Sequence, residues 1–188
     1  MANKIKYGLK SCYYSVVTNT AGVITYGTPV ALPGAVSLAL SPVGEAVKFY
    51  ADDIEFFRGH GTDVGYDGTL ELAMVPDAFL IDVMGMVEDS KKVLFESNAP
   101  IPKYIALMFE FQGDSNAIRH VLYNCLATRI NLESNTKSAT LEPKTDTISI
   151  EARPAVDTNY IKAKSTDTTD ATVYANWYTA VQNYVAGV

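Results

Sequence analysis

Hydrophobic and polar side chains alternate over several stretches of the chain, with the period of two that is typical of a β-strand. Residues 104–112 follow this pattern, and because their second face is itself half apolar, we expect both sides of this strand to be covered. Residues 118–132 run back after a turn. Residues 147–153 alternate cleanly, with inward positions at Ile148, Ile150 and Ala152. Adjacent antiparallel strands with turns this short indicate a mainly β fold, a sandwich or a barrel.

Two further β-prone runs lie within residues 45–57 and predict two successive strands. The side chains that define them are Val47, Phe49 and Tyr50, and then Ile54, Phe56 and Phe57. A glycine-rich connection over residues 59–65 follows. The pair Asp67-Gly68 is a turn signal, after which residues 69–75 are expected to form another strand.

The apolar period changes to three or four residues at two places. Pro76 suits the first position of a helix, and the pattern after it predicts a short helix over residues 76–84 that Gly85 ends. A second helix is predicted over residues 170–184, with its stripe at Val173, Trp177, Val181 and Tyr184. A helix of about 15 residues is unstable by itself. Its aromatic face must therefore pack on the sheet of its own subunit or on a neighbouring subunit.

The first 44 residues contain turn signals between short β-prone runs, and we expect them to form an extended N-terminal arm. These signals are Ala21-Gly22, Tyr26-Gly27 and Pro33-Gly34. A length of 188 residues favours one domain over residues 1–188. The chain is 48% hydrophobic and 19% charged, which excludes a disordered protein.

Charge is distributed unevenly along the chain, whose formal net charge is −6. Residues 1–44 contain no acid and only the bases Lys4, Lys6 and Lys10, whereas residues 45–96 contain 12 acidic and 4 basic residues. One interpretation is ordinary solvation. The other is a basic arm on one copy that meets an acidic loop on the next. The net negative charge argues against general nucleic-acid binding, because phosphate affinity requires clustered Lys and Arg.

No targeting segment or membrane span is expected. The first ten residues lack the apolar core of a signal peptide, and polar, glycine and proline residues interrupt the uncharged stretch 11–44. Cys12 and Cys125 fit neither a disulfide framework nor a metal-ligand spacing. We expect two reduced thiols in a protein made in the cytoplasm.

No set of residues predicts catalysis, a cofactor or a metal site. His60 and His120 have no second ligand at metal spacing, and the glycine run 59–65 lacks the lysine of a phosphate-binding loop. The acids Asp52, Asp53, Glu55, Asp63 and Asp67 do not have the spacing of an EF-hand, although an irregular calcium site stays open. We expect the protein not to be an enzyme.

Several short segments follow one another along the chain in a recognisable order. They are Lys6-Tyr7-Gly8-Leu9-Lys10, Leu32-Pro33-Gly34-Ala35, Phe49-Tyr50-Ala51-Asp52-Asp53, the run from Gly65 to Ala73, Pro76-Asp77-Ala78-Phe79, Val83-Met84-Gly85, the run from Ala106 to Phe111, Arg119 with Tyr123-Asn124, Thr145-Asp146-Thr147, and Tyr174-x-x-Trp177. Taken together, these segments resemble the major tail (tail tube) proteins of long-tailed, non-contractile bacteriophages that infect Gram-positive bacteria.

The resemblance implies an antiparallel β-sandwich or barrel of tail-tube type with a flanking helix. It implies a virion protein whose hexameric rings stack into a tube, through which DNA passes without sequence-specific binding. It also implies tail partners such as the tape measure, terminator and distal tail proteins, and assembly in the host bacterial cytoplasm. It carries no catalytic, cofactor or metal residues, and no membrane contact.

Three hypotheses follow. The first is a ring-forming structural subunit, with inter-subunit contacts in the arm of residues 1–44 and in the loop over residues 59–68. The candidate residues are Lys4, Lys6, Lys10, Asp52, Asp53, Glu55, Arg58, His60, Asp63 and Asp67. The second is a small-ligand-binding β-barrel, which predicts a stable monomer with an enclosed cavity. The third is a hydrolase that uses His60 and nearby carboxylates.

Overall fold

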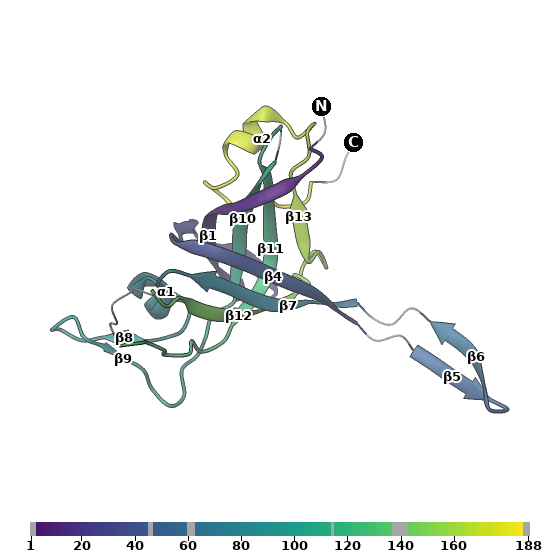
Figure 1. The fold of residues 1–188 in the computed structure, drawn as a ribbon, viewed down its shortest axis with the longest axis horizontal. Helices are drawn as coiled ribbons and strands as arrows, with labels where there is room; N and C mark the ends of the chain where they lie inside the picture. The colour runs from purple at the N-terminus through teal and green to yellow at the C-terminus, as the bar shows by residue number, and fades with distance from the viewer. Residues whose placement is uncertain (1–2, 45–46, 60–62, 114, 137–142, 186–188) are drawn as a thin grey trace.

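The computed structural model describes residues 3–44, 47–59, 63–113, 115–136 and 143–185, of which Val47, Arg58 and Asp63 are described by their backbone alone. The protein is mainly β, with antiparallel sheets and two short helices (Figure 1). The strands are β1 (Lys6–Thr20), β2 (Val23–Tyr26), β3 (Val30–Ala31), β4 (Ala35–Gly44), β5 (Val47–Ala51), β6 (Ile54–Gly59), β7 (Asp63–Leu72), β8 (Val87–Glu88), β9 (Leu94–Phe95), β10 (Ile105–Gly113), β11 (Ile118–Ala127), β12 (Asp146–Arg153) and β13 (Lys162–Lys164), and the helices are α1 (Asp77–Asp82) and α2 (Ala171–Ala175).

The large sheet has the strand order β2-β1-β10-β11-β12-β7-β4, with β3 paired to β1 and β13 paired to β11. Although four strands separate β1 from β4 in this order, the two strands pack in contact. The sheet therefore curls strongly and encloses a core on its concave side. β5–β6 and β8–β9 form two small separate hairpins.

The main core lies inside this curled sheet. Side chains from β1, β7, β10, β11 and β12 meet there, and the inward positions predicted for β12 are confirmed, since Ile148, Ile150 and Ala152 are buried. The short helix predicted over residues 76–84 is also confirmed, as α1. Its Phe79 is buried edge-on against the ring of Tyr14, with centroids 5.1 Å apart, and the Tyr14 hydroxyl donates to Asp82 over 2.9 Å.

A second, smaller core covers the opposite face of β10 and β11. Met108 and Val121 are buried there beneath Trp177 and Val181 of the C-terminal segment. The expectation that the strand at residues 104–112 is covered on both sides is therefore confirmed.

The C-terminal helix is much shorter than the predicted 170–184. Asp170 caps α2 by accepting hydrogen bonds from the backbone N–H groups of Thr172 and Val173, but the helix ends at Ala175. In a continued helix the Tyr174 carbonyl would accept from residue 178. Here it accepts instead from the guanidinium of Arg119 on the sheet and from the backbone N–H of Trp177 over 3.3 Å. The prediction of a helix over residues 170–184 was wrong because contacts with the sheet, which bury Trp177 and Val181, outweigh the helical period of the apolar residues.

The described part of residues 1–44 is not an arm. β1 pairs with β10 from Lys6, opposite Gly113, to Val16, opposite Ile105, and β4 pairs with β7. Tyr14 and Leu32 are buried in the main core. The segment is extended, as its composition suggests, but it is built into the sheet.

Two predicted boundaries also need correction. Asp67-Gly68 lies inside β7 instead of forming a turn, and the glycine is required because a Cβ on Gly68 would overlap the Ala39 carbonyl of β4. The strand predicted over residues 118–132 ends at Ala127, and Leu132 is exposed.

Candidate interaction surfaces

The β5–β6 hairpin, residues 47–59, projects from the body at the right-hand end of Figure 1. Its strands pair antiparallel around a two-residue turn at Asp52 and Asp53, whose φ angles are 51° and 62°. Aspartate tolerates this left-handed conformation better than most residues, and it is the backbone that a tight hairpin turn needs. The two strands predicted within residues 45–57 are confirmed.

Large apolar side chains on this hairpin point into solvent. They are Phe49, Tyr50, Ile54, Phe56 and Phe57, each between 56% and 72% exposed. Isolated apolar residues on a surface are ordinary, but five on one short hairpin form a concentrated patch. A two-stranded hairpin is at best marginally stable by itself, so contact with another surface would stabilise it.

A second exposed apolar region lies at the opposite end of the long axis of the molecule, around α1, β8 and β9 (Figure 1). We call it the apolar end; its exposed members are Met74, Val87, Phe95, Ile101 and Leu132. Beside them is a small hollow of about 180 Å³ lined mainly by Val75, Leu80, Met84, Met86 and Ile130. Arg129 and Glu96 form an ion pair of 2.8 Å at its edge.

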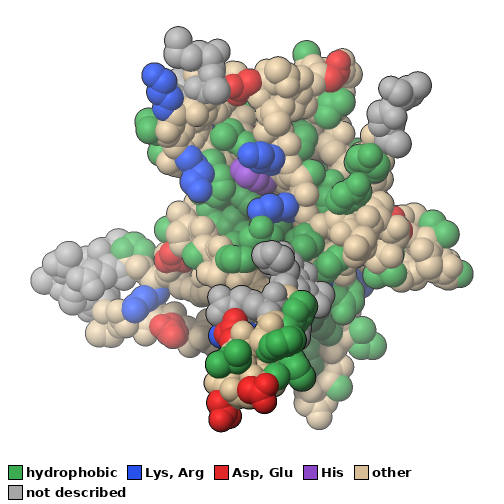
Figure 2. Space-filling model, turned by 90° about the vertical axis from the view of Figure 1, so that its right-hand side faces the viewer, with side chains coloured by type: hydrophobic (Ala, Val, Ile, Leu, Met, Phe, Trp, Pro, Cys, Tyr) green, Lys and Arg blue, Asp and Glu red, His purple; other side chains and the backbone are tan. Residues whose placement is uncertain are grey.

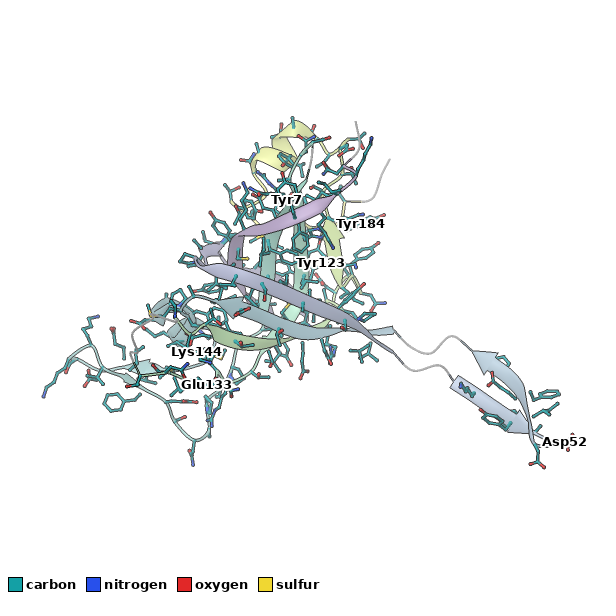
Figure 3. The ribbon with its side chains drawn as sticks, viewed as in Figure 1. Tyr7, Asp52, Tyr123, Glu133, Lys144 and Tyr184 are labelled. Atoms are coloured by element: carbon teal, nitrogen blue, oxygen red, sulfur yellow. The ribbon has the colours of Figure 1, made fainter. Side chains whose placement is uncertain are left out.

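The structure brings together only part of the predicted inter-subunit set. Asp52, Asp53 and Glu55 are grouped at the hairpin tip, where Figure 3 labels Asp52, and Lys48 lies 4.0 Å from Glu55. The backbone of Arg58 lies in β6 of the same hairpin. His60 lies outside the described residues.

The remaining candidates belong to the body. Lys6 and Lys10 are on β1, and Lys10 lies 3.4 Å from a Glu110 oxygen. Asp67 forms an ion pair with Arg153 of the neighbouring strand β12, and the Asp63 backbone begins β7. Lys4 precedes β1 and makes its own contact. Within one chain, Lys6 and Lys10 and the acidic hairpin tip therefore belong to separate parts of the structure.

Glu110 is the most deeply buried acid of the described residues, at 4% exposure. Its carboxylate lies 3.2 Å from Arg119 Nε and accepts hydrogen bonds from the hydroxyls of Ser11 and Tyr178, each over 3.1 Å. Burial, followed by the negative charge of Glu110, raises the pKa of Tyr178, which therefore stays protonated and donates. This network fastens the C-terminal segment to the sheet.

A third surface, which the sequence did not single out, is a hollow of about 440 Å³ between β4, β7, β10 and β11. We call it the lysine-rimmed hollow. Figure 2 shows it facing the viewer, with the histidine in purple and lysine side chains in blue around it. Its lining comprises Lys6, Leu38, Ala39, Leu40, Ser41, Tyr66, Phe109, Phe111, His120, Val121, Leu122 and Lys162. These residues are scattered over the sequence, so no local motif could have revealed them.

Within the part of the chain that the structure describes, the cysteines and the potential metal ligands do not form a reactive site. Cys12 and Cys125 are buried, and burial raises the pKa of each thiol to about 12, which makes both poor nucleophiles. Among the described residues no group of three or more His, Cys, Asp or Glu side chains could hold a metal ion. None of the described helices has the length and apolar character needed to cross a membrane.

No protein-family model matches the chain, and no curated protein matches its sequence.

Proposed function

We propose that this chain is a structural subunit of a bacteriophage tail tube, which assembles with copies of itself into hexameric rings that stack head to tail. The proposal starts from the resemblance of the sequence motifs to major tail proteins. The observation that carries it furthest is the projecting β5–β6 hairpin with its exposed aromatic side chains. Such a hairpin is expected on a protein that completes its packing against a partner.

The position of the two apolar surfaces supports a head-to-tail arrangement. The hairpin and the apolar end lie at opposite ends of the long axis, so neither can cover the other within one chain. When two different surfaces of identical subunits meet, the contact repeats and produces rings or open filaments. Burying the exposed apolar side chains of both surfaces would contribute about 25 cal/mol for each Å² removed from water.

Net charge supports the role of a conduit for DNA. A tube that lets DNA pass should not retain it, and each phosphate that a fixed cation neutralises adds affinity. A subunit with a formal net charge of −6 gives a ring that repels polyanions on average. The proposed location is the virion tail, with tape measure, terminator and distal tail proteins as further partners.

Negative-stain electron microscopy of the concentrated full-length protein tests the proposal. We expect rings or tubes of uniform diameter. Replacing two exposed hairpin aromatics, Phe56→Ser with Phe57→Ser, should abolish them while leaving the circular dichroism spectrum unchanged. The matched control is Val23→Ser with Val156→Ser, which removes two equally exposed apolar side chains elsewhere. A persistent monomer at every concentration, or tubes that survive the hairpin substitutions, would contradict the proposal.

A further inference from the structure

The lysine-rimmed hollow has a regular construction that its scattered sequence positions hide. Phe109 of β10 lies opposite His120 of β11, which lies opposite Lys164 of β13, so these three side chains form a row across three strands. Lys162 is two residues before Lys164 and therefore on the same face. This arrangement places Lys162 and Lys164 on the same face of the sheet as the rings of Phe109 and His120.

The positive charge around the hollow is not neutralised from within the described protein. Lys6, Lys162 and Lys164 have no carboxylate oxygen within 4.0 Å among the described residues. Lys6 instead lies 5.1 Å from the ring centroid of Phe111, and Lys162 lies 4.3 Å from that of Tyr66 and donates to its hydroxyl over 2.6 Å. Three uncompensated cations at one place are notable in a chain whose net charge is −6.

Aromatic and aliphatic side chains line the inside of the lysine-rimmed hollow. The rings of Phe109 and His120 stack at 5.1 Å with an interplanar angle of 9°, and Phe111 meets His120 edge-on at 5.3 Å. Leu38 and Leu40 of β4 line the other side. Burial, together with the charges of the three lysines, lowers the pKa of His120 to about 4, so its imidazole is neutral at pH 7 and adds no fourth cation.

We propose that the lysine-rimmed hollow binds a small organic anion, namely a carboxylate carried on a flat apolar ring. The ring would lie against Phe111, His120 and Leu40, and the carboxylate would reach the ammonium groups of Lys6 and Lys162, with Lys164 adding long-range attraction. A volume of about 440 Å³ lies within the usual range for small-molecule sites, about 300–1,000 Å³. A bare inorganic anion would leave the apolar lining unused, and a neutral ring would leave the cations unpaired. This site is independent of the tube proposal.

The test uses three probes and the full-length soluble protein in calorimetric titrations. Indole-3-carboxylate supplies both ring and charge, indole-3-carboxamide supplies the ring alone, and acetate supplies the charge alone. We expect saturable binding of the first, and at least tenfold weaker binding of the other two. No binding of indole-3-carboxylate at 10 mM, or equal binding of the carboxamide or of acetate, would overturn the proposal.

Matched lysine variants locate the site. Lys162→Ala with Lys164→Ala should weaken indole-3-carboxylate at least tenfold, and because both side chains are exposed, the fold should persist by circular dichroism. Lys91→Ala with Lys92→Ala removes the same charge from the β8–β9 turn and should leave binding unchanged. In nuclear magnetic resonance titrations the bound carboxylate should also raise the pKa of His120. Equal losses in both variants would show that only net charge matters and would contradict the assignment.

Discussion

At the scale of single residues, buried polar groups decide where distant segments meet. Glu110 and Arg119 are opposite each other on β10 and β11, and both are largely removed from solvent. Arg119 also lies 3.9 Å from the ring centroid of Tyr174. A buried ion pair of this kind adds little compared with an apolar pair, but removing one partner leaves the other uncompensated. These residues therefore position the C-terminal segment more than they strengthen the sheet.

Substitution of Glu110 tests this interpretation. Glu110→Ala should lower the free energy of unfolding by about 3 kcal/mol, because Arg119 would remain partly buried without its carboxylate. Urea unfolding monitored by Trp177 fluorescence measures the loss. Glu151→Ala is the matched control, since its carboxylate is 47% exposed and contacts Arg153 at the surface, where a pair contributes at most about 1 kcal/mol. Equal losses in both variants would argue against the role of burial.

The neutral imidazole of His120 predicts a pH dependence of stability. Its pKa falls from 6.5 to about 4 on folding, because the ring is buried and faces Lys6, Lys162 and Lys164, with Tyr66 also lining the hollow. Between these values the unfolded chain binds more protons, so the free energy of unfolding should decrease as the pH falls from about 6.5 to about 4. Urea unfolding at several pH values measures this change in the free energy of unfolding. His120→Phe should show a shallower dependence, and an identical slope would contradict the prediction.

At the scale of elements, the pairing of strands is limited by how closely two backbones approach. In β7, Gly68 lies between Leu40 of β4 and Ile150 of β12. A side chain there would meet the β4 backbone, so this strand needs glycine where a sequence pattern suggests a turn. A contact with the sheet also limits α2. The Tyr174 carbonyl, which would accept from residue 178 in a longer helix, accepts from Arg119 of the sheet.

Gly68→Ala should therefore be strongly destabilising, since neither β4 nor β12 can move without breaking its ladder. We expect a loss of at least about 2 kcal/mol, in the range of overpacking substitutions. Gly27→Ala is the control: its nearest neighbour would be the Val16 carbonyl at an ordinary 3.5 Å. Thermal unfolding measures the melting temperatures of the two variants, and we expect the lower value for Gly68→Ala. Similar melting temperatures would mean that the strands separate more easily than this packing implies.

At the scale of the whole molecule, the three candidate interaction surfaces lie on different parts of the protein. The aromatic hairpin and the apolar end lie at opposite ends, and the lysine-rimmed hollow opens on the face shown in Figure 2. Within this arrangement Lys6 and Lys162 line a hollow that also contains apolar side chains, and other Lys and Arg residues, such as Lys92 and Arg129, lie elsewhere on the protein. Binding of duplex DNA requires a long stripe of Lys and Arg. Such a stripe would retain DNA inside the proposed conduit.

The proposed tubes should accordingly not retain duplex DNA. In co-sedimentation with linear duplex at about 150 mM salt, we expect binding weaker than about 100 µM, the weak end of non-specific affinity. Lowering the salt should not produce the steep rise in affinity that counterion release gives to a cationic surface. Sedimentation of DNA with the tubes at this salt would contradict the proposed conduit role.

Several parts of the fold could be predicted from local sequence. Alternation identified β10 and β12, the period of three to four identified α1, and aromatic and β-branched runs identified β5 and β6 as two successive strands. These elements were predictable because period, turn residues and helix caps act over a few neighbouring residues.

Only the tertiary structure decided how distant segments combine. It placed β1 against β10, ended α2 at Ala175, and gathered Lys6, His120 and Lys162 around one hollow. Each of these depends on contacts between residues far apart in the chain. By itself the sequence determined a mainly β chain with a negative net charge and two successive aromatic-rich strands. Long-range pairing and burial decided which surfaces that chain presents, because the local period of a strand does not specify which distant strand it pairs with or which buried ions meet.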